Sequence, residues 1–166
     1  SITMKARYRI IIKILSIFIP DGPYGDSLRG KLMRPFLKSC GSNFKVGSQA
    51  FIFNPAGLSV GKNVYIGFNS YLGQGEILLE DEVLIGNGVS ITASNHLKKN
   101  GSYRFSGFEP KKVTIKKGAW IAANSSILAG ITVGAGSCIG AGAVVTKDVP
   151  DDKVYIGVPA KDVAHD

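Results

Sequence analysis

Aliphatic residues recur every six positions along the stretch from Ile115 to Pro150. The first place of each hexad is aliphatic: Ile115, Ile121, Ile127, Val133, Ile139 and Val145. The fifth place is small or aliphatic: Ala119, Ser125, Ile131, Ser137, Ala143 and Val149. A helix drifts out of phase with a six-residue period, and an open amphipathic sheet alternates every two residues. Six residues instead suit a short strand and a turn, with one side chain per strand pointing to a common axis.

Further hexads precede this stretch. They start at Val46, Ile52, Val60, Ile66, Leu72, Leu79, Ile85 and Ile91, with a two-residue slip at Leu58 and Ser59 and a one-residue slip before Leu79. Such repeats are typical of a β-helix solenoid, in which three hexads make one triangular coil. We predict an all-β domain over residues 46–161, a parallel β-helix of about five coils. The slips are expected to bulge outward between coils, and residues 162–166 to form a short C-terminal tail.

Residues 1–45 lie before the repeat and are predicted to be a helical cap segment. Basic residues surround an apolar run from Ile10 to Ile19, which is too short to span a bilayer and lacks a signal-peptide cleavage site. Residues 5–19 either pack as a helix on the end of the solenoid or contact an anionic membrane as an interfacial segment. The turn residues Asp21-Gly22-Pro23 follow, and Ser27 to Lys38 predict a short basic helix.

A second interruption separates the hexads at residues 97–112. An insertion of this kind leaves the solenoid as a protruding loop, and such loops often carry a binding face. Within the loop, three aromatic residues, Tyr103, Phe105 and Phe108, accompany the basic residues Lys98, Lys99 and Arg104. These side chains either line an anionic sugar site or pack against a neighbouring coil or subunit.

The formal net charge of +8 predicts an anionic partner, such as a phosphorylated cofactor, a nucleotide sugar, an anionic glycan or a lipid head group. We expect no nucleic-acid partner, because no recognisable nucleic-acid-binding module accompanies the charge. The 21 glycines suit a solenoid with tight corners. Cys40 and Cys138 lack metal-ligand spacing and are expected to be reduced, inert thiols of a cytoplasmic protein.

His96 is the only histidine within the repeat region, and it immediately precedes the loop. A lone histidine is usually structural, but a corner histidine beside a basic loop and a glycine-rich solenoid favours catalysis. The sequence resembles the left-handed β-helix acyltransferases of the hexapeptide family, in the branch of sugar and polysaccharide O-acetyltransferases. The resemblance runs from about residue 45 to Lys161. It rests on the hexads, on Asn95-His96, on GAWIAANSSILAGITVGAGSCIGAGAVVTKDVP and on Gly157-Val158-Pro159-Ala160-Lys161.

The resemblance implies a set of site residues. His96 corresponds to the general base, Ala123 to the backbone N–H that stabilises the oxyanion, and Trp120 to the aromatic residue at the acetyl and acceptor site. The resemblance further implies that acetyl-CoA is bound by Ala141, Thr146, Lys147 and Lys161. It places Asn95 and Asn69 at the acceptor site, with Gly67 as the alternative to Asn69. The group that orients His96 is open between Glu80, Asp81, Glu82 and a backbone carbonyl. A homotrimer is implied, with His96 of one subunit facing a cofactor held partly by the next.

We therefore expect an enzyme that moves acetyl from acetyl-CoA to a sugar hydroxyl of a bacterial-type surface polysaccharide (capsule, O-antigen or precursor), without a metal. Imidazole titrates near neutral pH and suits the removal of the hydroxyl proton. The nearest alternative is N-acetylation of a nucleotide-linked amino sugar. A metal-dependent hydratase of the carbonic-anhydrase type would need three convergent histidines, and a non-catalytic solenoid would need none. The expected location is the cytoplasm, or the inner face of its membrane if residues 5–19 contact lipid.

Overall fold

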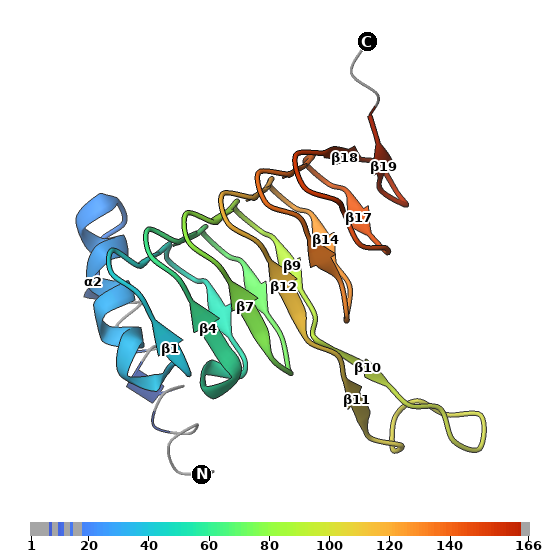
Figure 1. The fold of residues 1–166 in the computed structure, drawn as a ribbon. Coiled ribbons are helices and arrows are strands. Elements are labelled where there is room, and N and C mark those ends of the chain that lie inside the picture. The colour runs from blue at the N-terminus through green and yellow to red at the C-terminus, as the bar shows by residue number, and fades with distance from the viewer. Residues whose placement is uncertain (1–6, 8–9, 12–13, 15–17, 164–166) are drawn as a thin grey trace.

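The computed structural model describes residues 7, 10–11, 14 and 18–163, and its strands wind into a parallel β-helix (Figure 1). Sheet A holds β1 (Ser39–Cys40), β4 (Leu58–Val60), β7 (Ile77–Leu79), β12 (Val113–Ile115) and β15 (Thr132–Val133). Sheet B holds β2 (Lys45–Val46), β5 (Tyr65–Ile66), β8 (Leu84–Ile85), β13 (Trp120–Ile121), β16 (Cys138–Ile139), β18 (Val154–Ile156) and β19 (Lys161–Asp162). Sheet C holds β3 (Phe51–Ile52), β6 (Tyr71–Leu72), β9 (Ser90–Ile91), β14 (Ser126–Ile127) and β17 (Val144–Val145).

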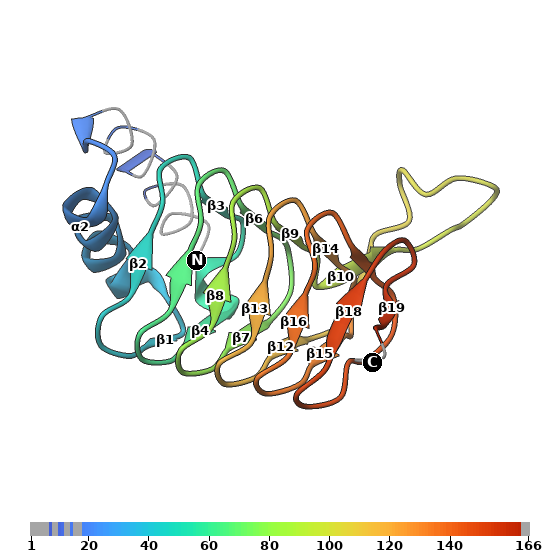
Figure 2. The same cartoon turned by 90° about the horizontal axis from the view of Figure 1, so that it is seen from above.

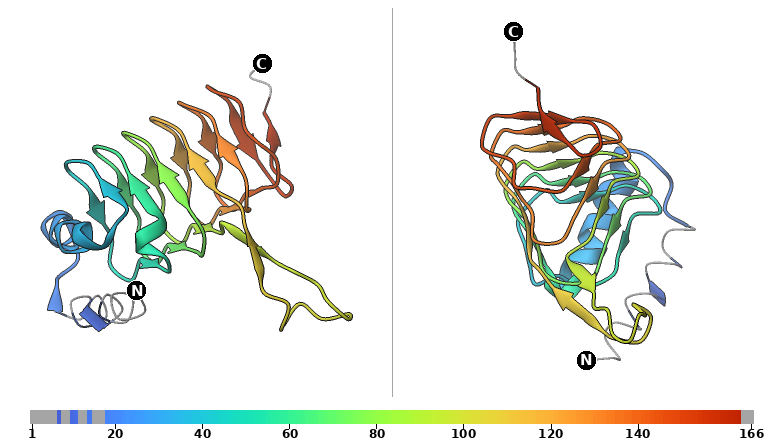
Figure 3. Two further views of the ribbon diagram at one scale, coloured as in Figure 1. Left: turned by 60° about the horizontal axis from the view of Figure 1, so that its bottom comes forward. Right: turned by 90° about the vertical axis from the view of Figure 1, so that its right-hand side faces the viewer.

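Each turn of the solenoid contributes one strand to sheet A, then one to sheet B and one to sheet C. The first turn is β1, β2 and β3, and the fifth is β15, β16 and β17. A parallel bridge from Val133 to Val149 and the strand β18 begin a sixth turn. The views from above and along the axis show the three-sided prism (Figures 2 and 3). The prediction of an all-β parallel solenoid of about five coils is confirmed.

The interior of the prism is the aliphatic column that the hexads predict. The first residue of every hexad named above is buried, with Val60 the most exposed at 4%. Ser125 and Ser137 occupy the fifth place of their hexads, and their hydroxyls donate hydrogen bonds to Ala122 O (2.7 Å) and Pro150 O (2.6 Å). These bonds satisfy the buried hydroxyls, so the fifth place accepts serine as well as alanine and valine.

The slip at Leu58 does not bulge outward as predicted. Leu58 is 1% exposed, and it is the register partner of the buried Ile77 in sheet A. The strands of sheet A have room for a second buried residue, so the extra residue joins the core. The chain instead leaves the regular path at the 3-10 helix Pro55–Gly57, just before β4.

Helix α2 (Pro23–Met33) and the 3-10 helix Arg34–Phe36 precede the first strand and cover the first turn. The helix starts four residues before the predicted Ser27, because Pro23 at its first position is already set for helical geometry. The guanidinium of Arg29 is buried and ties the helix down, donating to Asp26 Oδ1 (2.9 Å) and Ile19 O (2.8 Å). The first turn already begins at Ser39, before the first hexad at Val46.

Most of residues 5–19 lie outside the described residues, so the choice between a packed cap and a membrane contact stays a prediction. Ile10, Ile14 and Phe18 within this segment are exposed, and Ile19 is buried. Among the described residues, none of the helices has both the length and the apolarity to cross a bilayer. Residues 164–166 of the predicted tail are not described, and β19 returns antiparallel along β18 just before them.

A β-hairpin protrudes from the prism where the third turn passes from sheet C to sheet A (Figures 1 and 3). Its strands are β10 (Ser94–His96) and β11 (Phe108–Pro110), which pair antiparallel. Lys111 N donates to Ala93 O (2.9 Å) and closes the corner beneath the hairpin. The predicted protruding loop is confirmed, and it starts at Ser94, because that residue already pairs with Pro110 outside the solenoid.

Candidate active site

The corners of successive turns stack into edges, and the predicted site residues divide between two of them. The B–C edge, where the chain passes from sheet B to sheet C, carries Asn69, Ala123 and Ala141. The C–A edge carries the hairpin with Asn95 and His96, and higher up Thr146 and Lys147. Trp120 stands on the outer side of sheet B, and Lys161 lies in β19. One chain therefore does not bring His96 to the Ala123 amide.

The B–C edge presents a column of open backbone amides. Asn87, Ala123 and Ala141 occupy the third place of their hexads in three successive turns, since Ile85, Ile121 and Ile139 are register partners. Within the described part of the chain, none of these three amides donates a hydrogen bond. Successive amides in such a column are about 4.8 Å apart. The column offers backbone donors to an extended polar ligand or to a developing negative charge.

At other corners, the amide at the third hexad place donates a hydrogen bond to a side chain of the turn above. Phe68 N donates to Asn87 Oδ1 (3.0 Å), one turn above it on the B–C edge. On the A–B edge, Lys62 N donates to Asp81 Oδ1 (2.7 Å) and Ala135 N to Asp151 Oδ1 (2.9 Å). The Ala135 amide, together with Lys116, lowers the pKa of the Asp151 carboxyl. The amides of the column are open because the residues above them are Ala123, Ala141 and Gly157, which have no side-chain acceptor.

Gly86 also belongs to this edge, although nothing in the sequence marks it as a site residue. A Cβ at Gly86 would lie 2.8 Å from Ala123 N and 2.9 Å from Ile121 O. Any larger residue would therefore crowd the Ala123 amide from the turn below. Asn69 has a conformational reason for its place, because its φ of 54° is in the left-handed region that asparagine tolerates well. Its side chain is exposed on the same edge, two turns below Ala123.

His96 is exposed on β10 opposite Phe108. Residues directly opposite in an antiparallel pair project on the same face, so the imidazole stands beside the Phe108 ring. Asn95 points to the other face, since successive residues of a strand alternate. Within the described residues the His96 side chain makes no hydrogen bond. Its ring nitrogens are open to an acceptor substrate and to an orienting group.

The carboxylates considered for orienting His96 lie at a different corner of the same chain. Glu80, Asp81 and Glu82 form the A–B corner between β7 and β8. Glu80 Oε2 accepts from Lys117 N (2.9 Å), and Asp81 Oδ1 is the cap on Lys62 N. Glu82 has a φ of 63° and serves the turn. Two of the three are thus engaged in capping, and none adjoins His96 in sequence or in the ladder of its own chain.

Trp120 is the centre of an apolar column on the outer side of sheet B. The register places Tyr65, Leu84, Trp120, Cys138 and Val154 directly above one another. Leu84 is 42% and Trp120 48% exposed. Burial raises the pKa values of the Tyr65 hydroxyl and the Cys138 thiol, and Asp26 adds to the effect at Tyr65. Both groups favour their neutral forms, which suits a face that contacts another apolar surface.

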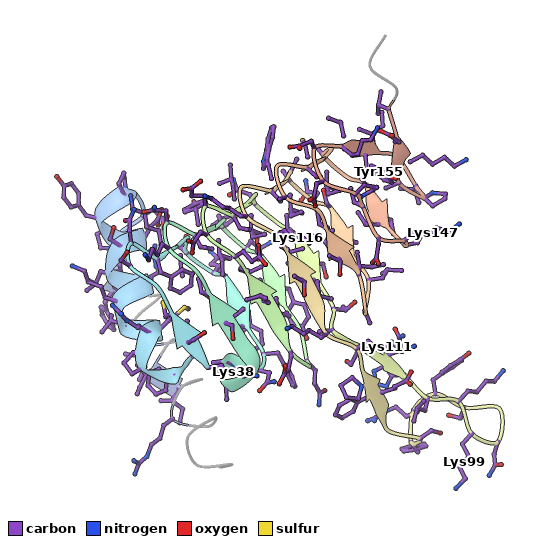
Figure 4. All side chains as sticks on the ribbon, in the orientation of Figure 1. Lys38, Lys99, Lys111, Lys116, Lys147 and Tyr155 are labelled. Atoms are coloured by element: carbon purple, nitrogen blue, oxygen red, sulfur yellow. The ribbon has the colours of Figure 1, made fainter. Side chains whose placement is uncertain are left out.

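Two lysines near the C-terminal end of the solenoid are open to anions. Lys147 follows β17, and Figure 4 shows it on the last turns, away from the hairpin. Lys161 lies in β19, whereas its neighbour Asp162 pairs with Lys153 (3.0 Å). Within the described residues neither Lys147 nor Lys161 has a carboxylate partner. The described residues also contain no group of three His, Cys, Asp or Glu side chains placed to hold a metal ion.

Two family models match the chain, one on each side of the hairpin. The model of bacterial transferase hexapeptide (six repeats) matches residues 112–147. The model of the hexapeptide repeat of succinyl-transferase matches residues 57–93. No curated protein matches the chain.

Solved structures share the fold over most of this chain. A hexapeptide-repeat-containing acetyltransferase from Vibrio cholerae O1 biovar eltor, complexed with acetyl coenzyme A, is 25% identical with a TM-score of 0.79, covering 92% of this chain and 83% of that one. A galactoside acetyltransferase in complex with coenzyme A is 26% identical with a TM-score of 0.82, covering 97% and 82%. An N-acyltransferase from Bacillus cereus, in complex with dTDP-4-amino-4,6-dideoxyglucose and coenzyme A, is 24% identical with a TM-score of 0.63, covering 80% and 86%. At 24% identity, the likeness to the N-acyltransferase shows only that the fold is shared.

Proposed function

Two models of hexapeptide-repeat transferases match this chain, and we propose that it transfers the acetyl group of acetyl-CoA to a hydroxyl of a sugar. The open amide column at Asn87, Ala123 and Ala141 supports this proposal most directly, since it offers unpaired donors along one edge. The relatives crystallised with acetyl coenzyme A or coenzyme A support the donor. The galactoside acetyltransferase supports a sugar as the acceptor.

His96 is the general base of the proposed reaction. A sugar hydroxyl attacks a thioester poorly unless a base takes its proton during the attack. As the imidazole takes the proton, the hydroxyl oxygen bonds to the acetyl carbonyl carbon, and a tetrahedral oxyanion forms. The C–S bond then breaks, the imidazolium returns the proton to the departing sulfur, and the products are an acetyl ester and the CoA thiol. The open ring nitrogens of His96 suit this exchange.

The Ala123 N–H stabilises the oxyanion in this proposal. Backbone donors fixed in place before the reaction are effective because they need no reorganisation as charge develops. Removing one such donor typically costs about 10²–10³ in rate. Gly86 keeps the space beneath this amide free, and the Trp120 ring bounds the acetyl group.

Lys147 and Lys161 bind the phosphates of the donor, with Thr146 beside them and the Ala141 amide on the pantetheine arm. Lysine suits this work as a compact point charge on a flexible stem, without the bidentate geometry of arginine. Both lysines lie towards the C-terminal end of the solenoid and lack carboxylate partners within the described residues. Their charges therefore face solvent and are available to a phosphate.

The active site forms between copies of the chain, which assemble as a homotrimer. His96 and Ala123 lie on different edges of one prism, so a second copy is needed to unite them. The apolar column of sheet B, with Trp120 at its centre, is the face that association would cover. A closed ring of copies repeats one head-to-tail contact, so every copy gives its base to one site and its amide to another.

The acceptor proposed is a sugar of a surface polysaccharide or of its precursor. The protruding hairpin leaves the base on an open strand, which accommodates a large or polymeric acceptor. The alternative, N-acetylation of a nucleotide-linked amino sugar, would use the same base and donor. The two reactions differ in the bond formed, an ester in one and an amide in the other.

Incubation with labelled acetyl-CoA and a panel of acceptors tests the proposal. The panel contains neutral and acidic oligosaccharides of surface polysaccharides, simple sugars and nucleotide amino sugars. We expect label in an oligosaccharide product that mild alkali releases, since esters are cleaved under conditions that spare amides. An alkali-stable product formed only from amino sugars would establish the alternative. No product from any acceptor, with no thermal stabilisation by CoA, would contradict enzymatic function.

A further inference from the structure

The tip of the hairpin carries unpaired cations beside exposed aromatic rings. Its residues between β10 and β11, numbers 97–107, include Lys98, Lys99 and Arg104 and no aspartate or glutamate. The rings of Tyr103 and Phe105 are 57% and 87% exposed. Exposed rings gathered at one place can form a contact surface for a ligand or another molecule.

Two of the tip cations, Lys98 and Arg104, lie over aromatic rings and not beside carboxylates. Lys98 Nζ lies 5.6 Å from the centre of the Tyr103 ring, and the Arg104 guanidinium lies 5.3 Å from that of Phe105. No ion pair to Lys98, Lys99 or Arg104 forms among the described residues, whereas Lys111 at the base pairs with Glu109 (3.2 Å). A cation over a ring is positioned but not neutralised. The tip therefore presents an oriented positive charge to an incoming ligand.

A continuous ladder links the tip to the proposed base. His96 pairs with Phe108, Leu97 N donates to Gly107 O (3.1 Å), and Lys99 and Ser102 exchange hydrogen bonds of 2.9 and 3.0 Å. At the rise of an extended strand, Lys99 lies about 10 Å from His96. Figure 4 shows Lys99 at the far end of the hairpin, away from the solenoid, and Lys111 at its base. A ligand whose hydroxyl reaches His96 would thus extend along the cations.

We propose that the acceptor is an acidic carbohydrate, and that Lys98, Lys99 and Arg104 bind its carboxylate or phosphate while Tyr103 and Phe105 cover its sugar rings. The inference rests on the proposed function and adds the class of acceptor. The donor phosphates are assigned to Lys147 and Lys161, so the hairpin cations have no other ligand in the reaction. A negatively charged group on the acceptor would supply the partner that these three cations lack among the described residues.

Matched acceptors test this inference. One pair is an oligosaccharide containing a uronic acid and its carboxyl-reduced form, and the other is a phosphorylated oligosaccharide and its dephosphorylated form. Wild-type protein is expected to favour one acidic member over its neutral partner by about tenfold in kcat/KM, and the preference should shrink as added salt screens the charges. The pair that shows the preference identifies the anion as carboxylate or phosphate.

The double variant Lys98→Gln/Arg104→Gln should lose most of that preference through a higher acceptor KM, with kcat and the KM for acetyl-CoA unchanged. Lys62→Gln, an exposed lysine at the A–B corner, is the matched control and should behave as wild type. Calorimetry with the His96→Ala variant gives a readout without turnover, in which the acidic oligosaccharide binds more tightly than its neutral form.

Three results would overturn the inference. Equal use and equal binding of neutral and acidic members would remove the charge requirement. A raised KM for acetyl-CoA in the double variant would assign the cations to the donor. Binding to vesicles of anionic lipid that the double variant loses, with acceptor kinetics unchanged, would assign the tip to a membrane. In each case acetyl transfer to sugars persists, whereas failure of the proposed function itself would appear as no transfer to any sugar.

Discussion

Replacement of His96 by alanine is expected to lower kcat for acetyl transfer by about 10²–10⁴, the usual contribution of a general base. The KM for acetyl-CoA should change little, because His96 lies on the hairpin while the donor is proposed to lie along the amide column and the C-terminal lysines. Steady-state kinetics with an accepted oligosaccharide measure both quantities. The exposed position of His96 predicts that the variant folds as well as wild type.

His165, the other histidine of the chain, provides the matched control for this variant. His165→Ala is expected to retain wild-type kcat, which would exclude a general effect of removing an imidazole. Retention of wild-type turnover by His96→Ala with every accepted sugar would mean that another group removes the proton, and the proposed role of His96 would be wrong.

Replacement of Ala141 by asparagine is expected to close the open amide below it. Asn87 caps Phe68 N from the same place in the hexad, one turn above, at 3.0 Å. The introduced asparagine side chain, in that geometry, would accept from Ala123 N and withdraw the proposed oxyanion donor. We expect kcat to fall by about 10²–10³. The melting temperature should be unchanged or higher, because the variant adds a hydrogen bond to an unpaired amide.

Ala135→Asn is the control for this substitution. Ala135 has the same place in its hexad on the A–B edge, one turn above Lys117, whose amide is already capped by Glu80 Oε2. The control should keep wild-type kcat and stability, since no amide of the proposed site lies on that edge. Full activity of Ala141→Asn, with a crystal structure showing the new hydrogen bond in place, would remove the Ala123 amide from the mechanism.

The core of the solenoid could be predicted from sequence because one buried aliphatic residue per hexad is a local pattern. Every predicted first place is buried, from Val46 to Val145. The slips could not be predicted in the same way, since burial of Leu58 depends on its register partner Ile77 in the next turn. The first turn at Ser39 was missed because Ser39 and Cys40 lack the aliphatic residue that marks a hexad.

The sequence predicts a set of site residues but not how they are arranged in space. The resemblance supplies His96 and Ala123, and only the passage of the chain between sheets shows that they lie on different edges. The open amides do have a sequence signal in the third place of the hexads. Where that place is Asn87 or Asp81, the side chain caps a backbone amide in the turn below. At Ala123 and Ala141 the place is alanine, which has no side-chain acceptor. Gly86 had no such signal, because many corners carry glycine and its contact with Ala123 N is made across turns.

In the proposed trimer, the general base and the oxyanion donor of one site come from different copies of the chain. Co-expression of His96→Ala and Ala141→Asn chains with different tags, followed by purification through both tags, tests it directly. In a cyclic trimer containing both chains, one site of the three joins an intact His96 to an intact Ala123 amide, so we predict about a third of wild-type activity from two nearly inactive parents. Mixed trimers as inactive as their parents would show that both groups act within one chain and would rule out a site shared between copies.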